Sequence, residues 1–493
     1  MPRAARWLAV LSLALTGCAH AALQYGRDGL APVDHAVRAG LVTGRYGTAY
    51  EAALGSAGRD RDRLLRALSV GALGLYASRT DSSVWALDRA WTLTEDRWSK
   101  RISTGAAAVV VNDYVMPYVP GKTERLFIPY YGALSWLARD DRDDAAVEAR
   151  RLTQLLGEAP ADGAAGADGE LRGVLHYVAG AVFEAAGERT SAEVAYRNAA
   201  RLVQVPVVRD SAVADSLVGD VVVVVEQGFV GHPVPRDETV WVSRHEYSGL
   251  RRDDRALRDP VVRGVVVRES MRGVGPWYGR GVAMGVGLTL NWAEFRDGRA
   301  AVRALAVGTP GAAQDVSNGG NVSRAVRADF EQGQPARFAR ALTRAATRAT
   351  LYDAAGDQLA KVGTDFKDDD RGRDAGRRRG AKAVSDGRAA NAPASNGSEA
   401  TEKSLGALAA VGRVLAGLSL FALAAASDVN DVPDLRSWNV LPHDVRVVRL
   451  QLAAGEHDVH AMVDGVPVTV RRVQVRPGTV TVINYRAFGA DRR

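Results

Sequence analysis

The chain has 493 residues, of which 47% are hydrophobic and 25% are charged, a composition typical of folded globular domains and not of disordered chains. The formal net charge is +7, but acidic residues are nearly as common as basic ones and no basic stripe with interleaved aromatics occurs. Nucleic-acid binding is therefore not expected. A single cysteine excludes a disulfide framework, and the length predicts two or three domains.

The first 17 residues have the layout of a bacterial secretion signal. Arg3 and Arg6 precede an apolar stretch over 7–15, which is too short for a bilayer because a spanning helix needs about 20 residues. The next residues complete a lipobox, formed by Leu15, Thr16, Gly17 and Cys18. The sequence therefore predicts a signal peptide over 1–17 and a mature chain that begins at the cysteine.

Cys18 is the predicted attachment site for diacylglyceryl and acyl (palmitate) lipid, and no other cofactor is expected. Three acyl chains make a stable anchor, since each buried methylene contributes about 0.8 kcal/mol. Ala19 stands where lipoproteins retained in the inner membrane usually carry aspartate, so the lipobox resemblance implies the outer membrane, on its periplasmic face. The alternative is an ordinary secretory signal with a chance cysteine.

Residues 18–215 are predicted to form an α-helical domain. In the segment 171–205, Gly187 marks a turn, and Ala192, Tyr196 and Ala199 share one helix face. The small residues admit the neighbouring helix and the aromatic ring fills the gap, as in a tetratricopeptide repeat. The segment 126–156 is similar, with its turn at Asp140-Asp141. Three or four such units are expected, and a non-repetitive bundle is the alternative.

Residues 216–364 are predicted to form a β-rich domain with a helix. Five consecutive valines, 221–225, are typical of a buried strand. Pro233 and Pro235 predict turns. Further strands are expected over 239–243, 261–267, 282–290 and 302–307, and a helix over 325–351.

Residues 365–403 are predicted to be a disordered, charged linker, because this stretch has almost no large apolar residue to bury. The apolar segment Ser404–Ser427 is long enough to span a bilayer. However, Arg413 near its middle would cost about 2.5–3.5 kcal/mol there. A buried or groove-lining helix is therefore favoured over a membrane span.

The remainder of 404–493 is predicted to be an antiparallel β module. Asp464-Gly465 is a two-residue hairpin turn. Arg471-Arg472 shifts the alternation of the second strand, which indicates a bulge. The strand over 480–485 is expected to close a meander. The fold class that follows is α+β, with helical repeats first and mixed or antiparallel strands after them.

Several short segments match a known pattern: Asn112-Asp113, Pro117-Tyr118, Tyr130–Leu134, Glu148–Leu152, Val221–Gly228, Asp434–Trp438 and Leu441-Pro442. In this order they resemble a family of uncharacterised bacterial lipoproteins with a tetratricopeptide-like helical domain and a C-terminal β-containing region. The resemblance covers most of the mature chain outside 365–403. It implies an architecture and an envelope location, and no activity.

No catalytic or metal site is expected from the sequence. The eight histidines are scattered, and His457 and His460 would point to opposite faces of a strand. The glycines over 281–287 lack the spacing of a phosphate loop, and no Gly-x-Ser-x-Gly motif occurs. The chain is therefore not expected to be an enzyme.

The leading functional hypothesis is a lipid-anchored scaffold or adaptor that holds one or more envelope proteins in a helical-repeat groove. Exposed groove positions are expected at Tyr130, Arg139, His176 and Tyr177. One alternative is an envelope enzyme or glycan-binding protein that uses the strands between Gly219 and Leu290. Another is a structural component that buries Ser404–Ser427 against a second chain. The oligomeric state is left open.

Overall fold

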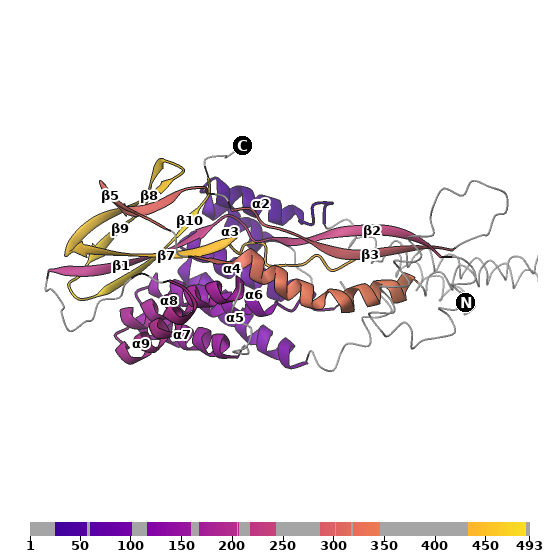
Figure 1. Ribbon diagram of the computed structural model, residues 1–493, viewed down its shortest axis with the longest axis horizontal. Helices are drawn as coiled ribbons and strands as arrows, with labels where there is room; N and C mark the ends of the chain where they lie inside the picture. Colours follow the sequence, from indigo (N-terminus) through magenta and orange to yellow (C-terminus); the bar gives the residue numbers. More distant parts are fainter. Residues whose placement is uncertain are drawn as a thin grey trace, which may run out of the picture.

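The computed structural model describes residues 25–56, 60–100, 116–158, 167–204, 206, 217–242, 286–300, 302–316, 319–345 and 432–489. Helices occupy the N-terminal half and strands follow, so the chain has an α+β fold (Figure 1). The lipobox, the strand over 261–267, the linker over 365–403 and the Ser404–Ser427 segment lie outside the described residues. Among the helices that are described, none is long and apolar enough to cross a bilayer.

The described helices of the N-terminal half form four consecutive pairs. They are α2 (Pro32–Val42) with α3 (Tyr46–Gly55), α4 (Arg63–Tyr76) with α5 (Thr80–Lys100), α6 (Lys122–Leu137) with α7 (Arg142–Gly157), and α8 (Ala167–Ala185) with α9 (Arg189–Leu202). A short 3-10 turn, η1 (Asp60–Asp62), precedes α4. Each helix packs against the next, so the pairs stack into one layer.

Glycines let the helices of a pair approach closely. A Cβ atom added to Gly71 would lie 2.5 Å from a carbon of Leu87, and one added to Gly180 would lie 2.7 Å from the ring of Tyr196. The predicted turn at Gly187 is confirmed by a positive φ of 81°. The packing of small residues against an aromatic ring thus follows the pattern in the sequence, while the assignment to tetratricopeptide repeats stays a prediction.

The described strands form three sheets. They are β1 (Val218–Gln227), β2 (His232–Val242), β3 (Val286–Arg296), β4 (Leu305–Thr309), β5 (Ala312–Asp315), β6 (Gly319–Asn321), β7 (Asp444–Ala453), β8 (Gly455–Val463), β9 (Val466–Val475) and β10 (Val480–Ala487). The central sheet has the order β10-β1-β7-β6, and the outer sheet has the order β5-β4-β8-β9. The strands β2 and β3 pair only with each other.

The central sheet is the middle of three layers. Val222 and Val224 of β1 belong to the core shared with the helices, whereas Val221, Val223 and Val225 belong to the core shared with the outer sheet. Figure 1 shows α7, α8 and α9 on one side of β1 and β7 and the outer strands on the other. The valine run is therefore the buried strand that was predicted, and it is apolar on both faces because both faces are covered.

The last strand corrects the predicted meander. The hairpin turn at Asp464-Gly465 is confirmed, with φ of 50° and 81°. The register of β8 and β9 shifts around Val470, next to the predicted bulge. However, β10 does not continue this hairpin. It crosses to the central sheet and pairs in parallel with β1, where Ile483 is buried in the same core as the valines.

The predicted separation of the β-rich domain (216–364) from the C-terminal module (404–493) is also wrong. Strands from both segments alternate in the central sheet and also pair with each other in the outer sheet, where β4 pairs with β8, so the two segments share their cores. Pro233 and Pro235 do not form turns but lie inside β2. Within the described residues one edge of β2 has no partner strand, and proline is tolerated on such an edge because no N–H is needed there.

The antiparallel strand pair β2–β3 and a helix over 322–345 form an arm that extends from the layered body (Figure 1). The rings of Trp292 and Phe338 lie 5.9 Å apart, and those of Phe295 and Phe330 lie 5.4 Å apart. Gln334 also donates a hydrogen bond of 2.9 Å to the carbonyl of Ala293. The helix thus packs along this strand pair, and it begins three residues before the predicted start.

An extended segment ahead of β7 joins the C-terminal strands to the helices. The buried Arg436 binds Asp62 at 3.0 Å and Asp434 at 2.8 Å. Trp438 is fully buried, and its backbone N–H donates to the carboxylate of Glu124 at 2.9 Å. These residues include the Asp434–Trp438 segment noted in the sequence, which therefore has a structural role in this chain.

A second buried ion-pair network joins the helical layer to the central sheet. Arg449 of β7 binds Glu184 of α8 at 2.9 Å and Asp220 of β1 at 2.6 Å. Its guanidinium also donates to the hydroxyl of Tyr196 at 3.2 Å. Both carboxylates are largely shielded from water, so removing the arginine would leave two shielded negative charges without this ion-pair partner.

We predict that Arg449→Met lowers the free energy of unfolding by about 3–5 kcal/mol, because it leaves two shielded carboxylates without their cation. Urea unfolding at neutral pH measures the change. Arg472→Met is the matched control, because Arg472 and its partner Asp458 lie at the surface, and its unfolding curve should match that of the wild type. Equal effects of the two substitutions would contradict the structural role of the network.

Candidate functional site

The structure places three of the four predicted groove residues in the interior. Tyr130 and Tyr177 are fully buried, and His176 is only 8% exposed. The strands β6, β7 and β10 pack on α8, and β10 also contacts α6. The inner face of the helical layer is therefore filled by the central sheet. The prediction that these residues are exposed is wrong, because the later strands cover the face that a repeat stack would leave open.

The fourth predicted residue, Arg139, is exposed in the turn after α6. It forms an ion pair with Asp81, and its guanidinium lies 5.1 Å from the centre of the Trp136 ring. Arg139 does not share a site with His176. Burial lowers the pKa of His176 to about 4, so this imidazole is neutral at physiological pH. The four residues do not form one binding surface.

A buried polar cluster lies where the helices meet the end of β1. Tyr76 and Tyr130 donate their hydroxyls to the carboxylate of Glu226, the latter at 3.2 Å, and the hydroxyls of Tyr76 and Tyr131 are 3.3 Å apart. Burial raises the pKa of Glu226, although the nearby guanidinium of Arg486 and the tyrosine hydroxyls act in the opposite direction. The cluster connects α4, α6 and the central sheet.

Arg486 of β10 supplies the positive charge of this cluster. One of its terminal nitrogens donates to the backbone carbonyls of Gly228, Val440 and Leu441 at 2.5, 3.0 and 3.2 Å. The other donates to the hydroxyl of Tyr76 at 3.4 Å. The guanidinium thus joins the loop after β1, the loop before β7 and the end of α4. Both terminal nitrogens of the guanidinium are engaged with groups of the protein, so Arg486 mainly shapes the wall of the adjoining cavity.

An open cavity lies directly beside this cluster. Its volume is about 720 Å³, within the range of about 300–1,000 Å³ that is typical of ligand pockets. A second cavity of about 240 Å³ shares Ala138, Arg471 and Asn484 with it. The two cavities therefore adjoin, and we call them together the edge-strand groove.

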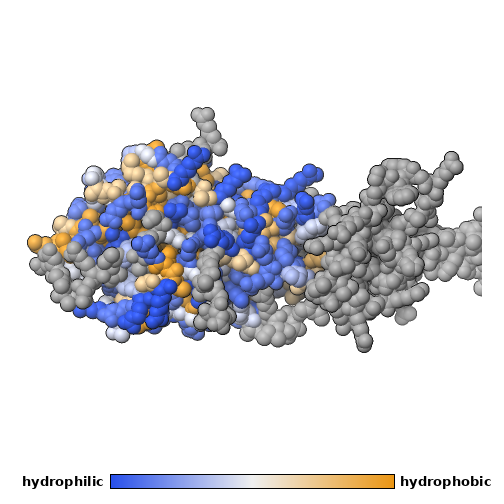
Figure 2. Space-filling model, in the orientation of Figure 1, coloured by the Kyte–Doolittle hydropathy of each residue, from blue (hydrophilic) through white to orange (hydrophobic). Residues whose placement is uncertain are grey.

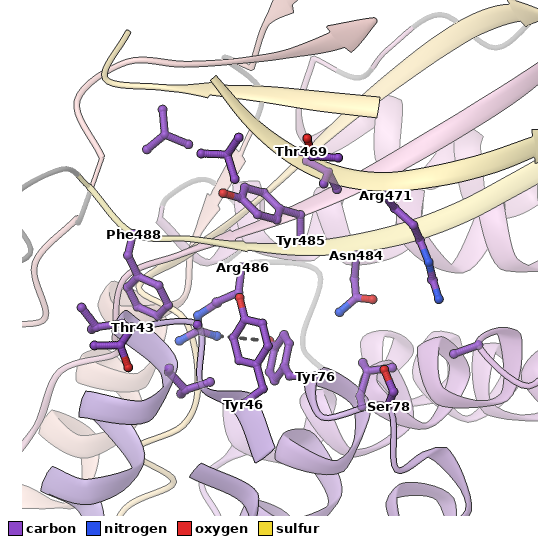
Figure 3. Close-up of a pocket in the computed structure, with 18 of the residues that line it drawn as sticks. Thr43, Tyr46, Tyr76, Ser78, Thr469, Arg471, Asn484, Tyr485, Arg486 and Phe488 are labelled. Atoms are coloured by element: carbon purple, nitrogen blue, oxygen red, sulfur yellow. Dashed lines mark hydrogen bonds between the residues drawn. The ribbon is translucent and has the colours of Figure 1, made fainter. Parts of the chain in front are cut away.

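Three elements form the walls of the edge-strand groove. Figure 3 shows Tyr46, Tyr76 and Ser78 rising from the helical layer below the wide cavity. Thr469 and Arg471 come from β9, and residues 484–486 come from β10. The groove therefore runs between the outer edge of the central sheet and the outer edge of the outer sheet, over the turns of the helical pairs.

The lining of the wide cavity combines apolar surface with positive charge. Val466, Val468 and Val470 line one side, and Val466 is 51% exposed at its rim. The charged residues of the lining are Arg471 and Arg486, and no carboxylate belongs to it among the described residues. Figure 2 shows apolar patches on the strand-rich end of the molecule, the end that carries β8 and β9. This chemistry suits a ligand that is partly apolar and neutral or negatively charged.

The sequence did not point to Tyr76, Glu226, Arg471 or Arg486 as site residues. Glu226 directly follows five consecutive valines, and Arg486 is the one charged residue of the strand Val480–Ala487. A charge at such a position has to find a partner, because an unpaired buried charge is costly. That rule could have linked the two strands, but the tyrosines that complete the cluster carry no comparable signal.

Comparisons of the chain with protein-family models, with curated proteins and with solved structures found no match. The site therefore has to be interpreted from its own chemistry. Within the described residues, His, Cys, Asp and Glu do not gather in a group that could hold a metal ion. The strand β1, which the enzyme alternative placed in an active site, is occupied by two hydrophobic cores on its two faces. The arrangement suits binding.

The buried cluster should make the free energy of unfolding depend on pH. The pKa of Glu226 is raised in the folded protein, so the folded state keeps this proton at a pH where the unfolded state has lost it. The free energy of unfolding then falls as the pH rises above the unfolded pKa, by about 1.4 kcal/mol for each pH unit by which the pKa is raised. Glu226→Gln removes this titration.

We therefore expect the stability of Glu226→Gln relative to wild type to improve as the pH increases from 4.5 to 8. Urea unfolding across this range measures the difference. Asp458→Asn provides a control, because Asp458 is a surface carboxylate whose pKa is lowered by Arg472, so its effect should not follow the same trend. Parallel stability curves for wild type and Glu226→Gln would contradict the raised pKa.

Proposed function

We propose that the protein is a lipid-anchored binding protein of the cell envelope, which acts as a scaffold or adaptor by holding a partner protein in the edge-strand groove. The observation that carries the proposal is the groove itself, two adjoining cavities of about 720 and 240 Å³ between two sheet edges and the helical turns. The groove takes the place of the binding surface expected from the sequence, the inner face of the helical layer, because the central sheet covers that face.

The rigidity of its walls supports this assignment. The floor belongs to helices whose core is continuous with the central sheet. Arg486 ties the end of β10 to three backbone carbonyls beside the cavity. A groove held in this way loses little conformational entropy on binding, which favours affinity.

The predicted cellular location supports a role in the envelope. The lipobox at Leu15–Cys18 would place the mature chain on the periplasmic face of the outer membrane, with acyl chains on the cysteine. A folded body on such an anchor can keep a second protein close to the membrane. Binding and anchoring together are what an adaptor requires, and no catalytic step is involved.

The anchor is tested by Cys18→Ser. We expect the wild-type protein to fractionate with the outer membrane and the variant to remain unprocessed or become soluble, because the thiol that carries the lipid is lost. Membrane fractionation with metabolic labelling by palmitate measures both effects. A variant that still fractionates with the outer membrane and is processed like wild type would contradict the anchor.

The groove is tested by crosslinked copurification from envelope extract. Thr469→Trp places a large ring in the cavity that Thr469 lines, and we expect it to lower the recovery of the partner by about tenfold, a cost of about 1.4 kcal/mol. Thr92→Trp is the matched control, because Thr92 is exposed on α5, outside the groove lining.

Equal recovery with both tryptophan variants would exclude the groove as the binding site. Recovery of glycan fragments in place of a protein would favour the glycan-binding alternative. If neither the lipidated protein nor a soluble form beginning at Ala19 retains a specific protein, the adaptor proposal fails.

A further inference from the structure

The strand β10 has one edge that no described strand pairs with. It is the terminal strand of the central sheet and pairs with β1 alone. The pairing runs without interruption from Asp220 opposite Val480 to Gln227 opposite Ala487. The backbone groups that point away from β1 therefore form a regular outer edge, which is a template for a further strand.

This edge faces the groove. Successive side chains on a strand point to opposite faces of the sheet. A cavity that is lined by consecutive residues of a strand therefore faces its edge. Residues 481–484 line the narrow cavity and residues 484–486 line the wide one. The groove thus follows the edge of β10 over most of its length.

The opposite wall is less suited to pairing. Residues 468–471 of β9 also line the wide cavity consecutively, but this strand contains Pro467, which has no N–H, and the bulge around Val470. Proline and bulges are the features by which proteins protect an edge from additional strands. The residues 480–485 of β10 contain neither proline nor charge. Of the two edges, β10 is the one that can accept a strand.

The charge of the groove indicates what such a strand carries. Arg471 is exposed on β9, and no ion-pair partner is found for it within the described residues. The wide cavity it lines contains no described carboxylate, and the narrow cavity, which it also lines, adds one carboxylate, Asp140, and one further cation, Arg472. Val468 and Val470 lie next to it on the same wall. A segment with alternating apolar side chains and one carboxylate opposite Arg471 would be complementary to this surface.

We propose that the groove recognises its partner as an extended polypeptide segment, which adds as a strand to the edge of β10 and places an acidic side chain beside Arg471. This inference rests on the proposed function and specifies the partner chemistry. Backbone hydrogen bonds to β10 would supply affinity, and the valines and Arg471 would supply specificity. The segment extends the central sheet without disturbing its two buried faces.

The test uses the soluble mature chain beginning at Ala19 and a pool of synthetic peptides of about eight residues, a usual strand length. Threonine is fixed at alternate positions, the other positions vary among valine, isoleucine, leucine and phenylalanine, and one glutamate is fixed near the centre. The tightest peptide is remade with N-methyl groups on alternate backbone nitrogens, in each of the two possible registers.

We expect one methylated register to weaken binding by about tenfold or more and the other to weaken it much less, because only alternate N–H groups face the template strand. Fluorescence anisotropy measures the dissociation constants. Equal affinity of all three peptides would overturn strand addition in favour of a side-chain or lipid-like mode. Failure of the whole pool to bind would overturn it as well.

The contribution of the Arg471 charge is tested in a separate experiment. Arg471→Glu should weaken the glutamate peptide by about fivefold or more and favour the same peptide with lysine at that position, because the paired charges are reversed. Arg197→Glu, at an exposed position on α9, is the matched control and should change neither affinity. An Arg471→Glu variant that keeps the wild-type preference would remove Arg471 from the proposal.

The two levels of the proposal can fail independently. If Thr469→Trp abolishes recovery of the partner but N-methylation has no effect, the groove still binds a protein and only strand addition is wrong. If Thr469→Trp leaves recovery unchanged, the function assigned to the groove is wrong, whatever the synthetic peptides do.

Discussion

The central sheet has to be covered on both faces, and the other layers are arranged around that requirement. Five consecutive valines in β1 alternate between the core under the helices and the core under the outer sheet. Exposing either set would lose about 25 cal/mol for each Å² of apolar surface. The helical layer and the outer sheet are therefore mutually dependent, although they do not share a single core.

Charged residues fix how the layers meet. Arg449 joins α8 to β1 and β7, Arg436 joins the extended segment to the start of α4, and Arg486 joins β10 to the loops beside Glu226. Each is buried and engaged with carboxylates or carbonyls. A buried ion pair often contributes little net stability, but removing one partner is costly. Such contacts penalise any other arrangement of the layers.

Filling the helical face moves the binding surface to the sheet edges. A stack of helical pairs with an open inner face could hold a ligand there, but in this chain the central sheet occupies that place. What stays open is the channel where β9 and β10 part above the helical turns. Because two edges and the cationic Arg471 converge in this channel, backbone pairing and charge can act on the same ligand.

The sequence by itself determined the local features: the helical pairs with their turns at Asp140-Asp141 and Gly187, the buried valine strand, and the hairpin at Asp464-Gly465. These depend on periodicity and on φ preferences of neighbouring residues. Only the tertiary structure decided that β10 pairs in parallel with β1, that Tyr130 and Tyr177 are buried, and where the groove lies. These depend on contacts between segments more than two hundred residues apart, for which the local pattern holds no information.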